Sequence, residues 1–269
     1  MHKFLFLYLS ILFIISGSSS TKFLSKSFFS SLSGQYTKIN PSILKKSLGL
    51  KDFYVIDTRD ISKAALGYIS NTLIVPISML NWLSLVVPNL ASIIVITESS
   101  NYITTLNKIE SYGRYKIYGY CFYDEVTKFP YFDIKKIEYN QNTKESIQDI
   151  VNSKENIIDV REVNEYHETG VIKEAKLIPL STFLNKYSNI PKSGDVYVFC
   201  KSGMRAVIAM SFAKRYGFTN NFIIMKGGIT QAIKEGYPLV HYIEKWNWNL
   251  LWKDLYVIKD LFIFIWIKF

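Results

Sequence analysis

Apolar and polar residues alternate in blocks from residue 51 onward. The continuous apolar runs IIDV (157–160), VYVF (196–199) and FIIM (222–225) are typical of strands buried on both faces of a parallel sheet. The segment AVIAMSFAKRY (206–216) is rich in helix formers and is followed by Gly217, a residue type that often ends a helix. Strands that alternate with helical stretches predict an α/β fold built on doubly wound parallel sheets.

The pattern occurs twice, at a spacing of about 100 residues. The first half contains FYVIDTRD (53–60), GYISNTLIVPIS (67–78) and SIIVITESSN (92–101), and the second contains NIIDVRE (156–162), GVIKEAKLIPLS (170–181) and DVYVFCKSGMR (195–205). Both halves contain the same features in the same order: a strand, Asp-x-Arg, Gly-x-Ile, Ile/Val-Pro and a second strand. We therefore predict two domains in tandem, over 51–130 and 145–240, joined by the polar residues 130–147.

The N-terminal residues have the composition of a targeting sequence. The apolar run FLFLYLSILFII (4–15) follows a short basic start, and small residues come after it, so a signal peptide is predicted over 1–20, with an uncleaved membrane anchor as the alternative. Residues 21–50 are rich in Ser and Lys and contain no acidic residue, which is typical of a transit peptide. Together they predict entry into the secretory pathway and delivery to a complex plastid, with plain secretion as the alternative.

The formal net charge of +10 is concentrated in this leader. Residues 1–51 contain seven Lys and no Arg, Asp or Glu, so the remainder of the chain carries only +3. A nucleic-acid-binding stripe is therefore not indicated.

Residues 241–269 form an aromatic tail with four of the five Trp. The tail is expected either to pack over the domain interface or to make a peripheral membrane contact.

The cysteine and histidine residues predict no metal site. Cys121 and Cys200 are too few for a disulfide framework, and no CxxC or HxxxH pair offers zinc ligands. Cys121 follows a Tyr-rich strand and is interpreted as a core residue, with a resolving thiol as the alternative. His167 and His241 are interpreted as surface or packing residues.

Cys200 lies where a predicted strand ends and a predicted helix begins. In an open α/β sheet, ligands bind outside the carboxyl ends of the strands. Gly203 permits a positive φ, so that successive backbone N–H groups can point at one atom, and the helix N-terminus adds a positive potential. Lys201 and Arg205 add positive charge. We therefore predict that Cys200 is a stabilised thiolate nucleophile, with a buried structural cysteine as the alternative.

The second half resembles the rhodanese-like domain family over residues 145–240. The motifs that carry the resemblance occur in order: IIDVRE (157–162), EYHETGVI (165–172), IPL (178–180), VFCKSGMRA (198–206), MKGG (225–228) and GYPL (236–239). The resemblance implies sulfurtransferase activity without a cofactor, in which Cys200 accepts sulfane sulfur as a persulfide from a small anionic donor such as thiosulfate. A thiol or protein acceptor would then take the sulfur.

The resemblance also implies the roles of the residues around Cys200. The residues that bind the substrate would be Lys201, Ser202, Gly203, Met204 and Arg205, through their backbone N–H groups. Asp159 and Arg161 would support the loop or form an ion pair at the strand end. Three positions depart from the family pattern, because Val171 replaces a His, Glu174 replaces the Gly of a Gly-Ala pair and Ala232 replaces a Trp.

Two other functions are weighed against sulfur transfer. A phosphatase or arsenate reductase is disfavoured, because the loop from Cys200 to Arg205 is C-x4-R and those related enzymes use a loop one residue longer. A non-catalytic binding or regulatory module is the other alternative. Cys200 lies 41 positions after Asp159. In the first half, the residue 41 positions after Asp57 is Glu98, which lies in a loop that contains neither Cys nor Arg. We therefore expect a degenerate, inactive first copy.

Overall fold

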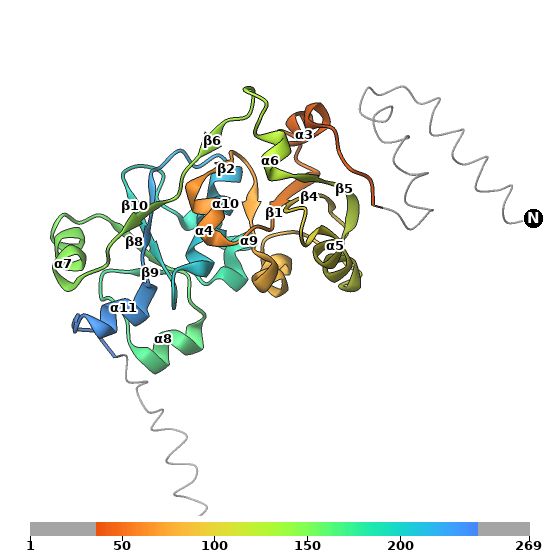
Figure 1. Cartoon of the computed structure of the whole chain (residues 1–269). Coiled ribbons are helices and arrows are strands. Elements are labelled where there is room, and N and C mark those ends of the chain that lie inside the picture. Colours follow the sequence, from red (N-terminus) through yellow and green to blue (C-terminus); the bar gives the residue numbers. More distant parts are fainter. Residues whose placement is uncertain (1–35, 242–269) are drawn as a thin grey trace, which may run out of the picture.

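The computed structural model describes residues 36–241, in which two parallel β-sheets are flanked by helices (Figure 1). The expected signal peptide (1–20), the first part of the transit-like leader and the tail after His241 lie outside the described residues. Within residues 36–241, none of the helices combines the length and the apolar character needed to cross a bilayer.

The first sheet has the strand order β3-β1-β4-β5, and all of its pairings are parallel. Its strands are β1 (Phe53–Asp57), β3 (Leu73–Ile74), β4 (Ser92–Thr97) and β5 (Lys116–Phe122). Every residue of β1 is buried, as expected for a strand covered on both faces. The helical segments of this half are α3 (Pro41–Ser47), α4 (Ile61–Leu66), the 3₁₀ segment η2 (Ile77–Leu85), α5 (Tyr102–Ser111) and α6 (Tyr123–Val126).

The second sheet has the order β7-β11-β10-β8-β9 and is also parallel throughout. Its strands are β7 (Glu138–Asn140), β8 (Asn156–Asp159), β9 (Lys176–Leu177), β10 (Val196–Phe199) and β11 (Phe222–Met225). Its helices are α7 (Lys144–Asn152), α8 (Val163–Thr169), α9 (Phe183–Lys186), α10 (Met204–Arg215) and α11 (Gly228–Lys234), with 3₁₀ segments η3 (Leu180–Thr182) and η4 (Tyr187–Asn189). The parallel α/β fold predicted from the sequence is confirmed, and the predicted strands 157–160, 196–199 and 222–225 correspond to β8, β10 and β11.

The two sheets share one strand order. Strands β3, β1, β4 and β5 follow one another across the first sheet as β9, β8, β10 and β11 do across the second. A parallel bridge between Lys38 and Tyr120 lies on the outer side of β5, where the second sheet has β7 on the outer side of β11. The repeat read from the sequence therefore has a counterpart in the topology.

Both halves begin earlier than the sequence predicted. Residues 36–50, which were assigned to the leader, contain α3, whose Leu44 is fully buried against the first sheet, and the bridge from Lys38. The expected linker contains β7, which is an edge strand of the second sheet, and β6 (Ile134–Lys135), which pairs with β2 (Tyr68–Ile69). These strands are short and mostly exposed, so they show no apolar run in the sequence.

One hydrophobic core extends across both halves. It joins Ile56 and Val95 of the first sheet to Val198 and Ile224 of the second through the residues of α10. Residues 205–213 of α10 are all buried, because the helix packs on its own sheet and also against β3 of the first half. The first half therefore contacts the helix that follows the Cys200 loop.

Candidate functional site

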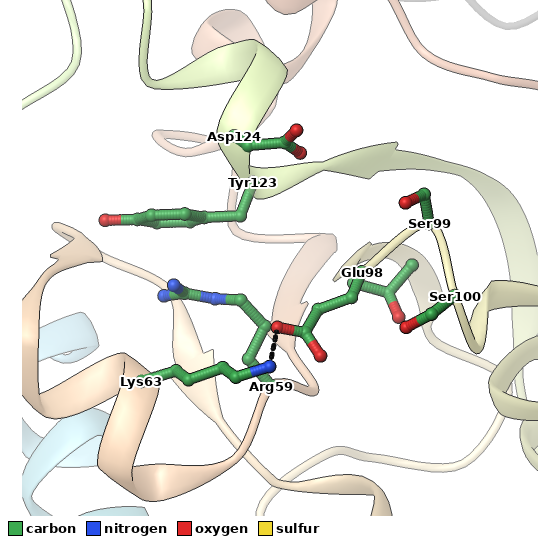
Figure 2. A pocket seen from close by; sticks show the side chains of 8 residues that line it. Arg59, Lys63, Glu98, Ser99, Ser100, Tyr123 and Asp124 are labelled. Carbon is green, nitrogen blue, oxygen red and sulfur yellow. Dashed lines mark hydrogen bonds and ion pairs between the residues drawn. The ribbon is translucent and has the colours of Figure 1, made fainter.

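The carboxyl edge of the first sheet contains a polar pocket of about 290 Å³ (Figure 2). Its lining residues come from α4, from α6 and from the ends of β1 and β4 with the loops that follow them: Arg59, Lys63, Thr97, Glu98, Ser99, Ser100, Tyr123 and Asp124. The Glu98 carboxylate pairs with Lys63 at 2.5 Å. No cysteine lines this pocket, so the first half has no thiol nucleophile at the edge where the second half has Cys200.

The strand register corrects the predicted equivalence of Glu98 and Cys200. Asp57 pairs with Ile96, and Asp159 pairs with Phe199, so the residue that corresponds to Cys200 is Thr97. The prediction was wrong by one position, because Thr97 lies 40 positions after Asp57, whereas Cys200 lies 41 positions after Asp159. The next helix begins five residues after Thr97 in the first half (α5) and four residues after Cys200 in the second (α10). The loop of the first half is therefore one residue longer, and its Thr97 hydroxyl donates to Asn101 Oδ1 at 3.2 Å.

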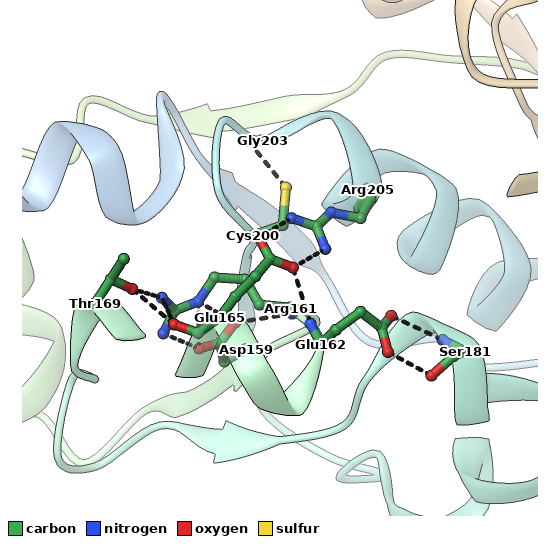
Figure 3. A network of polar contacts seen from close by, with 9 residues as sticks. All are labelled: Asp159, Arg161, Glu162, Glu165, Thr169, Ser181, Cys200, Gly203 and Arg205. Carbon is green, nitrogen blue, oxygen red and sulfur yellow. Dashed lines mark hydrogen bonds and ion pairs between the residues drawn. The ribbon is translucent and has the colours of Figure 1, made fainter. Parts of the chain in front are cut away.

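Cys200 follows β10 directly and begins the loop that leads into α10 (Figure 3). The residue is 1% exposed, and its sulfur accepts a hydrogen bond from the backbone N–H of Gly203 at 3.2 Å. Gly203 has φ +100°, a conformation that L side chains rarely adopt, and it precedes the first residue of α10. The predicted turn with a positive φ is confirmed, and it directs one amide at the sulfur from the N-terminus of a 12-residue helix.

The other residues of the loop have different surroundings. Lys201, Ser202 and Met204 are exposed, whereas Arg205 is 7% exposed. The structure therefore places the Lys201 and Ser202 side chains at the rim and the Arg205 side chain inside the site. Within residues 36–241, no group of three or more His, Cys, Asp or Glu side chains is placed to hold a metal ion.

The turn between β11 and α11, which contains Gly228, packs against the backbone of the Cys200 loop. The backbone N–H groups of Ile229 and Thr230, in α11, donate to the carbonyl oxygens of Cys200 and Lys201 at 2.9 and 3.2 Å. Gly228 lies so close to the loop that a Cβ at this position would overlap the Cys200 carbonyl oxygen. The fully buried Asn142 donates from Nδ2 to the Gly228 carbonyl at 2.7 Å. The MKGG motif (225–228) thus brings the backbone of this turn into close contact with the Cys200 loop and fixes the position of that loop.

Arg205 is paired with Glu165 of α8 through two hydrogen bonds (Figure 3). Nη1 and Nη2 of Arg205 donate to Oε2 and Oε1 of Glu165 at 2.5 and 2.7 Å. The hydrogen bond from Arg205 lowers the pKa of Glu165. Burial acts to lower the pKa of Arg205, but the Glu165 hydrogen bond and the charges of Cys200 and Glu165 raise it overall. The Arg205 guanidinium is therefore a fixed positive charge beside the sulfur.

Asp159 and Arg161 form a buried ion pair at the end of β8. Arg161 donates to both carboxylate oxygens of Asp159, at 2.6 to 3.0 Å, and its Nη2 donates to the Gly170 carbonyl at 2.9 Å. Burial raises the pKa of Asp159, and the hydrogen bonds from Arg161 oppose this shift. Nη1 of Arg161 donates to Thr169 Oγ1 at 2.5 Å. The pair thus holds both ends of the segment that contains α8 and Glu165.

The first half repeats the contacts of the arginine with the aspartate and with the glycine carbonyl. Arg59 donates from Nε and Nη2 to Asp57, and from Nη2 to the Gly67 carbonyl at 2.7 Å. Leu66 precedes Gly67 where Thr169 precedes Gly170, so the hydroxyl partner of the second half is missing, and the Arg59 guanidinium instead lies over the Tyr123 ring at 3.2 Å. Asp-x-Arg is therefore a structural element of both halves, whether or not a cysteine follows the central strand.

Sequence reasoning missed Glu165, Gly228 and Asn142 as site residues. Glu165 and Gly228 lie inside motifs of the predicted domain, but their partners are about 40 and 30 residues away along the chain.

Val171 and Cys121 are both packing residues in the structure. Val171 is fully buried and pairs through its backbone with Val240. Cys121 is 1% exposed in the core of the first half, as expected, and burial raises its pKa.

Comparisons with known proteins identify the second half. The rhodanese-like domain family matches residues 143–235. A sulfurtransferase from Allochromatium vinosum is 30% identical over 84 residues, covering 31% of this chain and 77% of that protein. A rhodanese domain-containing protein from Drosophila melanogaster is 35% identical over 109 residues, covering 35% of this chain and 97% of that protein. A solved rhodanese-related protein from Thermoplasma volcanium is 28% identical, with a TM-score of 0.34, and covers 39% of this chain and 100% of that chain. Through its second half, the chain belongs to the rhodanese-like domain family.

Proposed function

We propose that the protein is a sulfurtransferase that carries sulfane sulfur on Cys200 as a persulfide. The observation that carries this proposal is the position of the Cys200 sulfur, which lies at the carboxyl end of β10 and accepts the Gly203 N–H inside the segment matched by the family. The related Allochromatium vinosum protein is itself called a sulfurtransferase. The proposed donors are thiosulfate or a persulfide, and the proposed acceptors are thiols or proteins.

The proposed reaction has two steps that share the same sulfur. The Cys200 thiolate attacks the outer sulfur of thiosulfate, so that a new S–S bond forms on Cys200, the S–S bond of thiosulfate breaks, and sulfite leaves with the electron pair. An acceptor such as cyanide or a thiolate then attacks the outer sulfur of the persulfide. The bond to Cys200 breaks, the acceptor keeps the transferred sulfur, and Cys200 is left as the thiolate.

The surroundings of Cys200 suit an anionic sulfur. The Gly203 amide and the N-terminus of α10 provide hydrogen-bond donation and positive potential, and Arg205 provides a full charge. The residue is only 1% exposed, which leaves little room for a bulky donor at the sulfur. These features favour a small, extended anion over a bulky substrate.

We further propose that the first half is a degenerate copy of the second. The shared strand order and the repeated Asp-x-Arg contact to a glycine carbonyl support a common origin. Thr97 stands at the position of Cys200, and a threonine hydroxyl cannot form a persulfide. In this proposal, sulfur transfer is confined to the second half.

The direct test is sulfite release from thiosulfate with cyanide as the acceptor. Cys200→Ser is expected to abolish turnover, because a hydroxyl does not carry sulfane sulfur, whereas Cys121→Ser is expected to retain it. Turnover of Cys200→Ser at the wild-type rate would overturn the assignment. A folded wild-type protein that neither releases sulfite nor accepts sulfur on Cys200 would support a non-catalytic binding module.

A further inference from the structure

The first half contributes an aromatic side chain to the surroundings of Arg205. Trp82 belongs to η2, is half-buried, and has its ring centre 5.0 Å from Arg205 Cζ. A guanidinium at this distance from an indole face is attracted by the quadrupole of the ring, and the attraction grows when both groups are withdrawn from water. The Arg205 side chain is only 8% exposed, so it meets this condition.

Arg205 is therefore held by two groups from different halves. The Glu165 carboxylate binds both terminal nitrogens from α8, and the Trp82 ring contacts the guanidinium from η2. Arg205 itself lies in the first turn of α10, five residues after the Cys200 nucleophile. The position of its charge relative to the sulfur thus depends on the first half as well as the second.

Contacts along α10 fix η2 relative to the loop. The Ile74 N–H, just before η2, donates to Ser211 Oγ at 3.0 Å. At the other end of the helix, Arg215 Nη2 donates to the Phe53 carbonyl at 2.6 Å. Because α10 is bonded to the first half near its middle and at its C-terminus, its first turn and Trp82 are expected to keep a constant spacing.

We infer that Trp82 is a positioning residue of the Cys200 site, which holds the Arg205 guanidinium beside the sulfur and shields it from water. The inference rests on the proposed function for its effect on turnover. Removal of the ring admits water around Arg205, and the higher local dielectric weakens the effect of its charge on the sulfur. The first half, without a nucleophile of its own, thereby takes part in the chemistry of the second.

The test measures local charge without requiring sulfur transfer. In a Cys121→Ser background, Cys200 is alkylated with iodoacetate, an anion, and with iodoacetamide, a neutral reagent of similar size, and the ratio of the two rates reports the positive charge near the sulfur. In each reaction, a bond from sulfur to carbon forms and iodide leaves. Trp82→Ala is expected to lower the iodoacetate-to-iodoacetamide ratio about threefold to tenfold, whereas Trp82→Phe, which keeps an aromatic face, restores the ratio to within about twofold of wild type.

Two control variants separate positioning from packing. Trp82→Leu keeps an apolar side chain and fills the space, but it has no aromatic face, so it is expected to lower the ratio as Trp82→Ala does. Leu85→Ala, three residues after Trp82 at the end of η2, removes packing from the same segment and is expected to leave the ratio unchanged. Turnover of thiosulfate by Trp82→Ala is expected to fall about tenfold in kcat/KM.

The outcomes distinguish the inference from the proposed function. An unchanged alkylation ratio in folded Trp82→Ala and Trp82→Leu, in a protein that turns over thiosulfate, would overturn the role of Trp82 alone. A lowered ratio in a protein without sulfurtransferase activity would confirm the positioning role and overturn the proposed function. A ratio that falls equally in Leu85→Ala would show general loosening of η2 and would also overturn the role of Trp82.

Discussion

Arg205 and Glu165 are the pair of side chains on which the electrostatics of the Cys200 site depend most. Their two hydrogen bonds cross from the first turn of α10 to α8, and both side chains are largely withdrawn from water. A charged hydrogen-bonded pair with this geometry contributes more to stability than an exposed pair. At the same time, Glu165 neutralises part of the charge that Arg205 presents to the sulfur.

The contribution of the Arg205–Glu165 pair to the free energy of unfolding depends on pH. Arg205 lowers the pKa of Glu165 in the folded protein, so the stabilisation is fully present above the usual glutamate pKa of 4.5 and is lost as the pH falls through the lower, folded value. We expect Glu165→Gln to lower the free energy of unfolding by about 1–2 kcal/mol at pH 7. Urea denaturation of both proteins from pH 7 to pH 3 measures this difference, which should shrink below pH 4.5. A constant difference over that range would contradict the ion pair.

The local geometry of the Cys200 loop could be predicted from the sequence, whereas the contacts of Arg205 with distant residues could not. Cys200 and Gly203 are neighbours in the chain, so the loop and its positive φ follow from a short motif between a strand and a helix. Glu165 and Trp82 reach Arg205 from about 40 and about 120 residues away. A single sequence contains no signal for those contacts, because helix and strand periodicity reports only which face of an element is buried.

At the scale of elements, two loops are packed backbone to backbone. The loop from β10 to α10 carries Cys200, and the turn from β11 to α11 donates two N–H groups to its carbonyl oxygens. Gly228 makes this contact possible, because its φ of +57° and its missing side chain let the two backbones approach. The backbone geometry at Cys200 therefore depends on the turn from β11 to α11.

Gly228→Ala is expected to cost far more activity than a matched glycine substitution elsewhere. The new Cβ would overlap the Cys200 carbonyl oxygen and Lys201, so the loop must shift, at a cost of about 2–5 kcal/mol in stability and at least about tenfold in sulfite release. Gly217→Ala is the control, because Gly217 also has a positive φ but has nothing within 4 Å of a Cβ. The control should lose only about 1–2 kcal/mol and keep its specific activity. Equal losses in both variants, measured by thermal denaturation and turnover, would refute the contact.

Buried elements were easier to predict than edge elements. Strands β8, β10 and β11 are continuous apolar runs, because a parallel strand covered on both faces has no polar side. Strand β7 reads Glu-Tyr-Asn and pairs on one side only, so its sequence resembles a loop. The shift from Glu98 to Thr97 has another cause. The segment from Arg161 to Gly170 is one residue longer than the segment from Arg59 to Gly67, which changes the spacing without changing the strand register.

At the scale of the whole molecule, the two halves share one core. Residues 205–213 of α10 are buried between the second sheet and the first half, and side chains of both sheets belong to one cluster. Separation of the halves would expose an apolar face of the helix that follows the Cys200 loop. The first half therefore stabilises the site although it has no nucleophile of its own.

We expect the chain to unfold in a single cooperative transition. A shared core couples the halves, because neither can lose its packing without exposing apolar surface of the other. Differential scanning calorimetry should give one peak whose calorimetric and van't Hoff enthalpies agree. Substitution of Arg215 by Ala, which removes the hydrogen bond to the Phe53 carbonyl, should lower the midpoint and leave a single peak. Two resolved peaks in the wild-type protein would contradict a common core.

Mass spectrometry of the purified protein after incubation with thiosulfate tests most directly whether Cys200 carries sulfur. Peptide mapping without reductant should locate one additional sulfur atom on Cys200 and none on Cys121, and cyanide should remove it with formation of thiocyanate. The Cys200→Ser variant should remain unmodified. A folded protein whose Cys200 never gains sulfur from thiosulfate or from a low-molecular-weight persulfide would contradict the proposed sulfur transfer.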